Sequence, residues 1–331
     1  MRVGIMSFAH VHADGFAINL IANKDIDFVG FSDVDLERGK AASEQYNIKH
    51  FASHEDLLAQ NLDAVIICSE NAKHLQDIKL AANAGVHILC EKPIEISLEA
   101  ADQIGYLIKE KNLKFMTAFP MRFDPSIVKI KTMLEQNQLG TLYAVNGINH
   151  AQIPRRHRAW FADKSLAGGG AVMDHTVHLV DLLRWFTGSE VSTVYAEIEN
   201  PFVKDADIDT AGLVTIEFQN GLFATIDASW SRPEAYYPTW GHLKMELIAE
   251  NGTVEVDAFA QQLNQYSKKT DINASWIGWG SDSTKAMMAD FFDSIKNDRE
   301  PAINYNDGYQ ALKVALAAYE SAKTASVINL A

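Results

Sequence analysis

The strongest chemical pattern in the sequence is a polar stripe on an apolar segment that follows Gly168-Gly169-Gly170. Asp174, His178, Asp181 and Trp185 are spaced four, three and four residues apart, so they share one side of a helix. The other positions are mostly apolar, which predicts a buried helix whose stripe is either satisfied internally or faces a wet cleft. Asp174 and His178 could form a carboxylate–imidazole pair that raises the basicity of the ring. The alternative is an Asp–His pair that only holds the fold together. The three glycines would let a cofactor or substrate approach the backbone.

A second pattern is Glu91-Lys92-Pro93, which ends an apolar strand-like segment. Charged residues rarely end such a strand unless that end opens onto a cleft or they pair. Proline fixes the chain after Lys92 and so orients its ammonium group. A lysine held rigidly at such a strand end could hydrogen-bond a substrate hydroxyl and stabilise a developing alkoxide. A surface lysine in a loop is the alternative interpretation.

The turn after the first expected strand, Ser7-Phe8-Ala9-His10, matches a dinucleotide-binding turn poorly. Ser7-x-Ala9-x-x-His12 stands where G-x-G-x-x-G is typical, so Ser7 must adopt the tight turn and Ala9 adds a methyl group. His10 and His12 are either exposed or helix-capping residues, or donors to a pyrophosphate. No acidic or cysteine ligand lies at a recognisable spacing from this pair, so we predict no metal.

Asp33 ends the second expected strand, where an acidic residue can accept hydrogen bonds from an adenosine ribose and repel a 2′-phosphate. It could instead cap the following helix. We take the ribose contact as the prediction, which favours NAD as cofactor over NADP. Basic residues nearby, such as Arg38 or Lys40, could reverse that preference.

The first 120 residues alternate between strand-like and helix-like segments. Ser53 and Ser97 are expected to cap helices, and Gly85 to end one. The expected strands are 2–6, 28–31, 49–51, 64–68, 86–89 and 115–118. This alternation predicts a Rossmann domain over residues 1–120, built on a doubly wound parallel sheet.

After residue 120 the pattern changes to long segments of two-residue period. Asn220-Gly221 and Asn251-Gly252 are dipeptides typical of tight hairpins. The expected strands are 141–148, 192–198, 211–218, 222–229, 243–249 and 253–256, and the expected helices are 126–136, 172–186, 285–297 and 307–323. Residues 121–331 are therefore expected to form a substrate-binding α/β domain with an open, mainly antiparallel sheet. Helices should cover one face, and a homodimer or homotetramer should form through the other.

Composition excludes several classes of protein. The chain has 331 residues, 47% of them hydrophobic and 22% charged, with a net charge of −14, which suits a two-domain globular protein and disfavours nucleic acid as a partner. The dense basic run Arg155-Arg156-His157-Arg158 is either a solvated loop or an anion or substrate contact. No apolar run approaches a membrane span, no signal-peptide segment is evident, and Cys68 and Cys90 lie in apolar strands. We expect a cytoplasmic protein with no membrane contact.

Together these motifs resemble the GFO/IDH/MocA family of oxidoreductases (glucose–fructose oxidoreductase, inositol dehydrogenase and rhizopine catabolism proteins). The resemblance covers nearly the whole chain. It is carried by Ser69-Glu70-Asn71-x-x-His74, the segment 84–93 that ends in Glu-Lys-Pro, Arg122-Phe123-Asp124-Pro125, and Gly169-Gly170-x-x-x-Asp174-x-x-x-His178-x-x-Asp181.

The resemblance implies that Lys92, Asp174 and His178 are catalytic. It also implies that Ser69, Asn71, His74 and Glu91 line the cofactor site. Three departures stand out: the first turn lacks glycines, Glu70 replaces the usual proline, and Thr176 stands where the helix commonly has glycine. The first puts cofactor affinity in question, and the last could reshape the substrate pocket beside His178.

The resulting hypothesis is NAD-dependent hydride transfer to or from a small polyhydroxylated substrate, a sugar or a cyclitol. NADP is possible as cofactor. Candidate substrate contacts besides Lys92 are Arg155, Arg156, Trp160, Asp181 and the Tyr236-Tyr237 loop. Two alternatives stay open: a redox-neutral, NAD-dependent glycosidase-type enzyme, and a non-catalytic protein that senses the dinucleotide.

Overall fold

The computed structural model describes residues 1–156, 158–203, 206–232, 242–260, 262–266, 274–278 and 280–330. Two compact units are present, and each consists of several segments. The first comprises Met1–Phe119, Arg155–Gly168 and Thr284–Leu312, and the second comprises Pro120–Pro154, Gly169–Ser283 and Lys313–Ala331. A single boundary at residue 120, as expected from the sequence, does not account for the two later segments of the first unit. These segments join it through side chains such as Tyr305, whose hydroxyl donates to the carbonyl of Ala101 at 2.8 Å.

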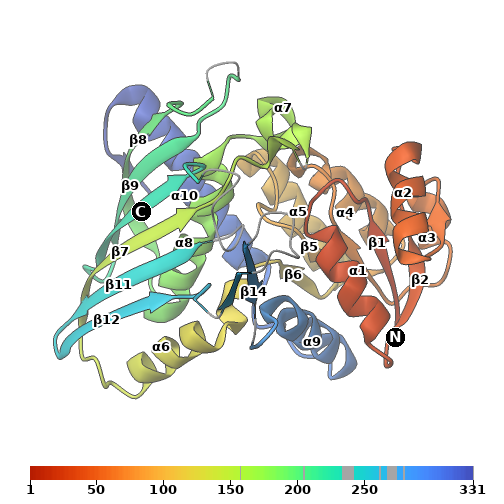
Figure 1. Ribbon diagram of the computed structural model, residues 1–331, viewed down its shortest axis with the longest axis horizontal. Helices are drawn as coiled ribbons and strands as arrows, with labels where there is room; N and C mark the ends of the chain where they lie inside the picture. The colour runs from red at the N-terminus through yellow and green to blue at the C-terminus, as the bar shows by residue number, and fades with distance from the viewer. Residues whose placement is uncertain are drawn as a thin grey trace. The chain divides into compact units, whose positions relative to one another are not determined.

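The first unit contains a six-stranded parallel sheet in the order β3-β2-β1-β4-β5-β6. Figure 1 labels its strands β1, β2, β5 and β6. Its strands are β1 (Arg2–Met6), β2 (Asp27–Ser32), β3 (His50–Phe51), β4 (Ala64–Ile67), β5 (His87–Cys90) and β6 (Phe115–Thr117). This order, with its reversal between β1 and β4, is that of dinucleotide-binding doubly wound sheets and confirms the predicted Rossmann fold. Ligands of such sheets bind at the carboxyl ends of the strands near the reversal.

The connecting helices begin and end largely as the sequence indicates. They are α1 (Ala13–Ala22), α2 (Leu36–Tyr46), α3 (His54–Leu58), α4 (His74–Asn83) and α5 (Leu98–Lys111), with α7 (Lys164–Ala167) and α9 (Ser283–Lys296) from later in the chain. The Ser53 hydroxyl accepts the N–H of Asp56 at 3.1 Å, and the Ser97 hydroxyl accepts that of Ala100 at 3.2 Å. Gly85 follows α4 with a φ of 71°, which glycine adopts readily.

The second unit contains a seven-stranded sheet in the order β12-β11-β7-β10-β9-β8-β15. Its strands are β7 (Leu142–His150), β8 (Val191–Glu199), β9 (Ala211–Phe218), β10 (Phe223–Ser229), β11 (Leu243–Ala249), β12 (Gly252–Asp257) and β15 (Ile328–Asn329). The predicted turns at Asn220-Gly221 and Asn251-Gly252 do join antiparallel neighbours. The sheet is nevertheless mixed, because β10 lies parallel to β7. The expected, mainly antiparallel sheet is thus confirmed, with one parallel pair: helices α7 and α8 (Ala171–Thr187) and strands β8 and β9 lie between β7 and β10 in the chain.

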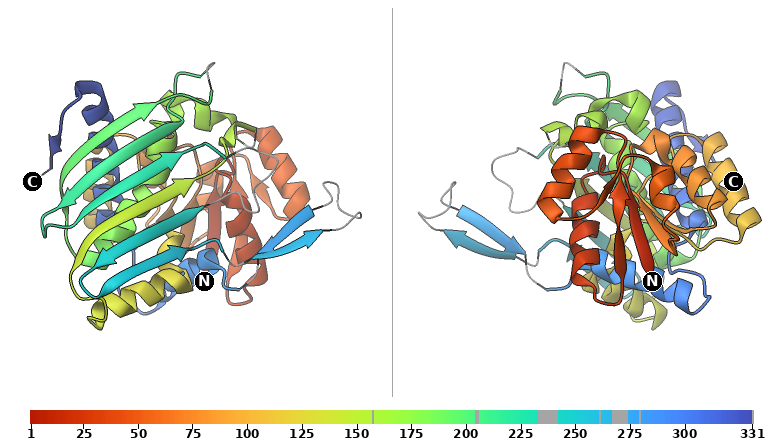
Figure 2. Two further views of the ribbon diagram at one scale, coloured as in Figure 1. Left: turned by 60° about the vertical axis from the view of Figure 1, so that its left-hand side comes forward. Right: turned by 90° about the vertical axis from the view of Figure 1, so that its right-hand side faces the viewer.

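Helix α8 (Ala171–Thr187) packs on one face of this sheet, against β7, β9 and β10. The opposite face, seen in the left view of Figure 2, exposes large side chains: Tyr195, Leu213 and Phe223 are 36%, 54% and 52% exposed. The remaining elements are α6 (Pro125–Glu135), the hairpin β13 (Gln262–Tyr266) and β14 (Ala274–Gly278), and α10 (Tyr305–Thr324), which runs across the division between the units. None of the helices in the described ranges is long and apolar enough to cross a membrane.

Candidate active site

The first turn, after β1, keeps a tight conformation without glycine. Ser7 has a φ of 70°, the left-handed region that favours glycine, and its hydroxyl accepts the N–H of Ala9 at 3.1 Å. The N–H of Phe8 donates to the Asp33 carboxylate at 2.8 Å, and that of His10 to the carbonyl of Cys68 at 2.8 Å. These three consecutive N–H groups thus have acceptors within the protein. The turn does not present the row of backbone donors that usually receives a pyrophosphate.

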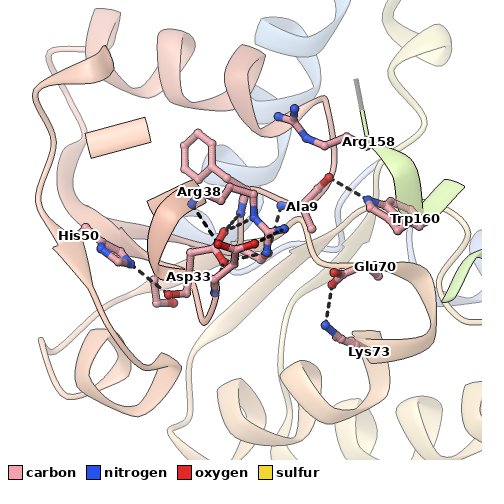
Figure 3. A network of polar contacts seen from close by, with 12 residues as sticks. Ala9, Asp33, Arg38, His50, Glu70, Lys73, Arg158 and Trp160 are labelled. Atoms are coloured by element: carbon pink, nitrogen blue, oxygen red, sulfur yellow. Dashed lines mark hydrogen bonds and ion pairs between the residues drawn. The ribbon is translucent and has the colours of Figure 1, made fainter. Parts of the chain in front are cut away.

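Asp33 is completely buried and its carboxylate accepts four hydrogen bonds. Two come from the N–H groups of Phe8 and Asp35, and two from Nε and Nη2 of Arg38, at 2.7 and 2.8 Å. Figure 3 shows the Arg38 guanidinium lying against this carboxylate. Burial alone would lower the pKa of Arg38, but the hydrogen bond and charge of Asp33 raise it. The helix cap is Asp35, which accepts the N–H of Arg38 at 3.0 Å. A ribose hydroxyl would have to compete with Arg38 for Asp33.

Glu91 and Lys92 are both buried where β5 ends, so a surface lysine is the wrong interpretation of this triplet. One oxygen of the Glu91 carboxylate accepts the N–H of Lys92 at 3.2 Å. The other oxygen lies 2.9 Å from Nδ1 of His12 and 3.9 Å from Nδ1 of His10. Burial alone would raise the pKa of Glu91, but the two imidazoles and the Lys92 ammonium hold it well below its usual value. The carboxylate is therefore ionised inside the protein.

Ser69, Asn71 and His74 lie after β4, and two of them join this segment to others. Both ring nitrogens of His74 face carbonyl oxygens, Nδ1 that of Pro93 at 3.0 Å and Nε2 that of Ser69 at 3.3 Å. His74 thus ties the chain after Lys92 to the end of β4. The Asn71 amide donates to the carbonyl of Ala167 at 2.9 Å. Among the residues that the structure describes, the buried side-chain oxygen of Asn71, Oδ1, has no hydrogen-bond partner.

A dinucleotide fits these residues in part. The sheet order and the buried, unsatisfied acceptor of Asn71 suit a ligand with hydroxyl or amide donors at the carboxyl ends of β4 and β5. The first turn suits its pyrophosphate less well, because the N–H groups of Phe8, Ala9 and His10 are engaged elsewhere.

Residues 155–168 pack beside the first turn within the same unit. The indole of Trp160 is buried, stacks on Phe161 and donates to the carbonyl of Ala9 at 2.9 Å (Figure 3). Arg158 pairs with Asp14 at 3.3 Å, while Arg155 is exposed. The side chain of Arg156 and the Tyr236-Tyr237 loop lie outside the described residues.

Helix α8 carries Asp174 and His178, both partly exposed. The Asp174 carboxylate lies 3.1 Å from Nε2 of His175 and 3.3 Å from the indole nitrogen of Trp230. His175 is itself held by Asn149, whose side-chain oxygen lies 2.8 Å from Nδ1. Sequence reasoning missed His175, because adjacent helical residues do not normally face each other. The pairing of Asp174 with His178 stays a prediction.

Asp181 also belongs to the stripe, and it has a partner that spacing did not indicate. Its carboxylate forms two hydrogen bonds with the buried Arg122 guanidinium, at 2.6 and 2.8 Å. This ion pair gives Asp181 a structural role within the second unit. A substrate contact for Asp181 stays a prediction.

The start of α8 is fixed by two residues from distant parts of the chain. Asp209 accepts the N–H groups of Gly170 and Val172 at 2.7 and 2.9 Å, and the Tyr319 hydroxyl donates to Asp209 at 2.7 Å. A methyl group added at Gly170 would lie 1.8 Å from the Asp209 carbonyl oxygen, and one at Gly169 would lie 2.2 Å from the Tyr319 hydroxyl. Glycine is therefore required at both positions by close contacts within the protein, with the Tyr319 side chain and the Asp209 backbone, and no ligand is needed to explain it.

Comparison with known proteins decides the family. The model of the oxidoreductase family with an NAD-binding Rossmann fold matches residues 3–119, and that of the GFO/IDH/MocA C-terminal domain matches residues 127–255. The chain belongs to the GFO/IDH/MocA family. The chain is similar to YrbE of Bacillus subtilis, named an uncharacterized oxidoreductase, which is 31% identical over 88% of this chain and 85% of its own length. It is also similar to myo-inositol 2-dehydrogenase of Thermotoga maritima, which is 25% identical over 100% of this chain and 98% of its own length.

Solved structures share the fold along the whole chain. GenD2 of gentamicin A biosynthesis, solved with NAD, has a TM-score of 0.89 at 22% identity and covers 100% of this chain and 96% of its own. At that identity the likeness establishes the fold alone. The family match makes the protein a GFO/IDH/MocA oxidoreductase with an NAD-binding Rossmann unit, as predicted.

Proposed function

We propose that this GFO/IDH/MocA oxidoreductase transfers a hydride between NAD and a secondary hydroxyl group, or the matching ketone, of a sugar or cyclitol. The single observation that carries the proposal is Lys92, a buried lysine beside an ionised glutamate where β5 ends. Relatives support the substrate class: besides the myo-inositol enzyme, they include scyllo-inositol 2-dehydrogenase (NAD(+)) of Bacillus subtilis, 26% identical over 84% of this chain and 80% of its own length.

In the proposed oxidation, the Lys92 ammonium donates a hydrogen bond to the reacting hydroxyl oxygen and stabilises its developing negative charge. His178 accepts the hydroxyl proton on a ring nitrogen, oriented by Asp174. Asp174 is itself positioned by His175 and Trp230. NAD held at the carboxyl ends of the parallel strands would supply the hydride acceptor for this oxidation. In reduction, the proton returns from His178 to the oxygen.

We propose cofactor contacts from residues at the carboxyl ends of four strands of the parallel sheet. They are Ser7, Phe8, Ala9, His10, Asp33, Ser69, Asn71, His74 and Glu91. Asn71 has the most direct support, because its buried carbonyl oxygen lacks a partner in the described part of the chain. His74 acts by holding the segment after Lys92. NADP is a second possible cofactor, since D-xylose 1-dehydrogenase (NADP(+)) 2 of Haloferax volcanii is 27% identical over 89% of this chain and 90% of its own length.

We further propose that the protein is a homodimer or homotetramer that forms through the exposed face of the seven-stranded sheet. Tyr195, Leu213 and Phe223 supply apolar area there, and such an area favours association. Leu213→Lys should lower the molar mass measured by light scattering, and an unchanged mass would exclude this face. We expect the protein to work in the cytoplasm, which agrees with Cys68 and Cys90, neither of which forms a disulfide.

The activity test is a screen of sugars and cyclitols for net NADH formation. Lys92→Ala and His178→Asn should each lower turnover by about 100-fold or more, because both remove a proton-handling group. Lys79→Ala and His87→Asn are matched controls in residues outside the proposed site, and both should retain activity. Full activity in either of the first two variants would refute the assigned roles. Dinucleotide binding without net reduction across the panel would favour the redox-neutral or sensing alternatives.

A further inference from the structure

The first turn brings three potential metal ligands together with Glu91. His10, His12 and Glu91 each offer one ligand atom within 4.8 Å of those of the other two, and they form the one such group found among the described residues. His10 and His12 come from the turn after β1, and Glu91 from the end of β5, 79 residues further on than His12. The spacing along the chain therefore gave no sign of the acidic ligand.

The three side chains are oriented by contacts of their own. The backbone N–H of Lys92 holds one Glu91 oxygen, which leaves the other, Oε1, facing both imidazoles. Nδ1 of His10 accepts the N–H of His12 at 3.2 Å, which shows that it is unprotonated, and it lies 3.9 Å from Oε1. An ion bound to this nitrogen would take the place of that hydrogen bond. Two electron-rich atoms at this separation are stabilised by a cation that both can bind.

The distances suit a small transition ion. Ligand atoms about 2.1 Å from a tetrahedral ion lie about 3.4 Å apart. The two Glu91–imidazole distances, 2.9 and 3.9 Å, lie on either side of that value, each about 0.5 Å from it, and the two imidazole ligand atoms lie within 4.8 Å of each other. Glu91 and His10 are buried, whereas the His12 side chain is 23% exposed, which leaves an approach for a fourth ligand.

We propose that His10, His12 and Glu91 bind a divalent transition ion of the Zn²⁺ or Co²⁺ class, with an open fourth position for water or an anion oxygen. Two imidazoles and one carboxylate with an open position form the donor set of catalytic rather than purely structural zinc sites. The site therefore selects a transition ion, which the imidazole nitrogens bind well, over Mg²⁺.

The test measures metal directly, without dinucleotide or substrate, so its result is independent of the proposed dehydrogenase activity. The full-length protein is stripped with a chelator and titrated with Co²⁺, followed by the visible absorption of the bound ion. Wild type should take up one equivalent per chain, and excess Zn²⁺ should displace it while Mg²⁺ should not. His12→Asn should weaken binding by at least about 100-fold, more than loss of an outer-shell partner does.

His87→Asn is the matched control, because His87 begins the same strand that Glu91 follows and lies outside the group. It should bind Co²⁺ as wild type does. Glu91→Gln, checked for folding by circular dichroism, should also lose the ion. Failure of the wild type to take up one equivalent, or retention of the same affinity in His12→Asn, would leave these residues a hydrogen-bonded network only and overturn the proposal.

Discussion

Gly170→Ala should destabilise the protein strongly, because the Asp209 backbone occupies the space that a side chain would need. The added carbon would lie 1.8 Å from the Asp209 carbonyl oxygen, whereas real contacts of this kind are essentially never under 3.0 Å. The backbones of residues 170 and 209 must therefore move apart by at least 1.2 Å, the difference between 3.0 and 1.8 Å. That shift takes the N–H groups of Gly170 and Val172, now at 2.7 and 2.9 Å from the Asp209 carboxylate, out of hydrogen-bond range.

Hydrogen bonds to a charged group contribute about 1.5–3 kcal/mol each, so losing two should lower the free energy of unfolding by about 3 kcal/mol or more. Urea unfolding measures this loss. Gly15→Ala is the matched control: a methyl group there meets nothing within 4 Å, and alanine in a helix should add up to about 1 kcal/mol. Turnover of Gly170→Ala should also fall, since the first turn of α8 carries Asp174. If Gly170→Ala unfolds at the urea concentration of the wild type, close approach of Asp209 is not what requires glycine.

Two further predictions concern Arg38 and His242. Arg38→Ala should raise the KM for NADP⁺ relative to that for NAD⁺ by about tenfold, because it removes the guanidinium that would face a 2′-phosphate and frees Asp33 for ribose. Steady-state kinetics with both cofactors measure this, Lys40→Ala is the control, and equal changes in both constants would contradict it. Burial and the charge of Arg232 lower the pKa of His242 to about 4, against the opposite effect of Asp257. The stability that depends on neutral His242 is therefore complete above its ordinary pKa of 6.5 and is lost as the pH falls from 6.5 towards 4. The urea midpoint should decrease between pH 7 and pH 5, and this decrease should be smaller in His242→Asn than in wild type. Equal decreases in the two proteins would exclude His242 as the cause.

The fold could be predicted from the sequence because its signals are local. Apolar runs separated by amphipathic segments indicate the parallel sheet, and dipeptides such as Asn220-Gly221 mark hairpins. The parallel pairing of β10 with β7 and the two-residue strand β15 escaped this reasoning. Neither leaves a local signal, since strand order depends on where the chain returns after a long connection.

The candidate site could be predicted only residue by residue. Strand ends and helix spacing drew attention to Asp33, Lys92 and Asp174, but each has contacts that no motif indicates. The Arg38 guanidinium donates two hydrogen bonds to the Asp33 carboxylate, and the His175 ring lies against the Asp174 carboxylate. Contacts of this kind arise from side-chain conformation and tertiary packing, and spacing along a chain carries neither.

The missing glycines of the first turn and the two histidines beside it are connected by the same physical requirement. A turn that binds an anion through backbone N–H groups must leave those groups open, and here Asp33, the Ser7 hydroxyl and Cys68 occupy three of them. An anion at this turn must therefore be met by side chains or by an ion that they hold. His12, which is partly exposed and fixed by Glu91, is placed for either role. Without the glycine pattern, anion binding at this turn would need a different means, and the Co²⁺ titration separates imidazole contacts from a bound ion.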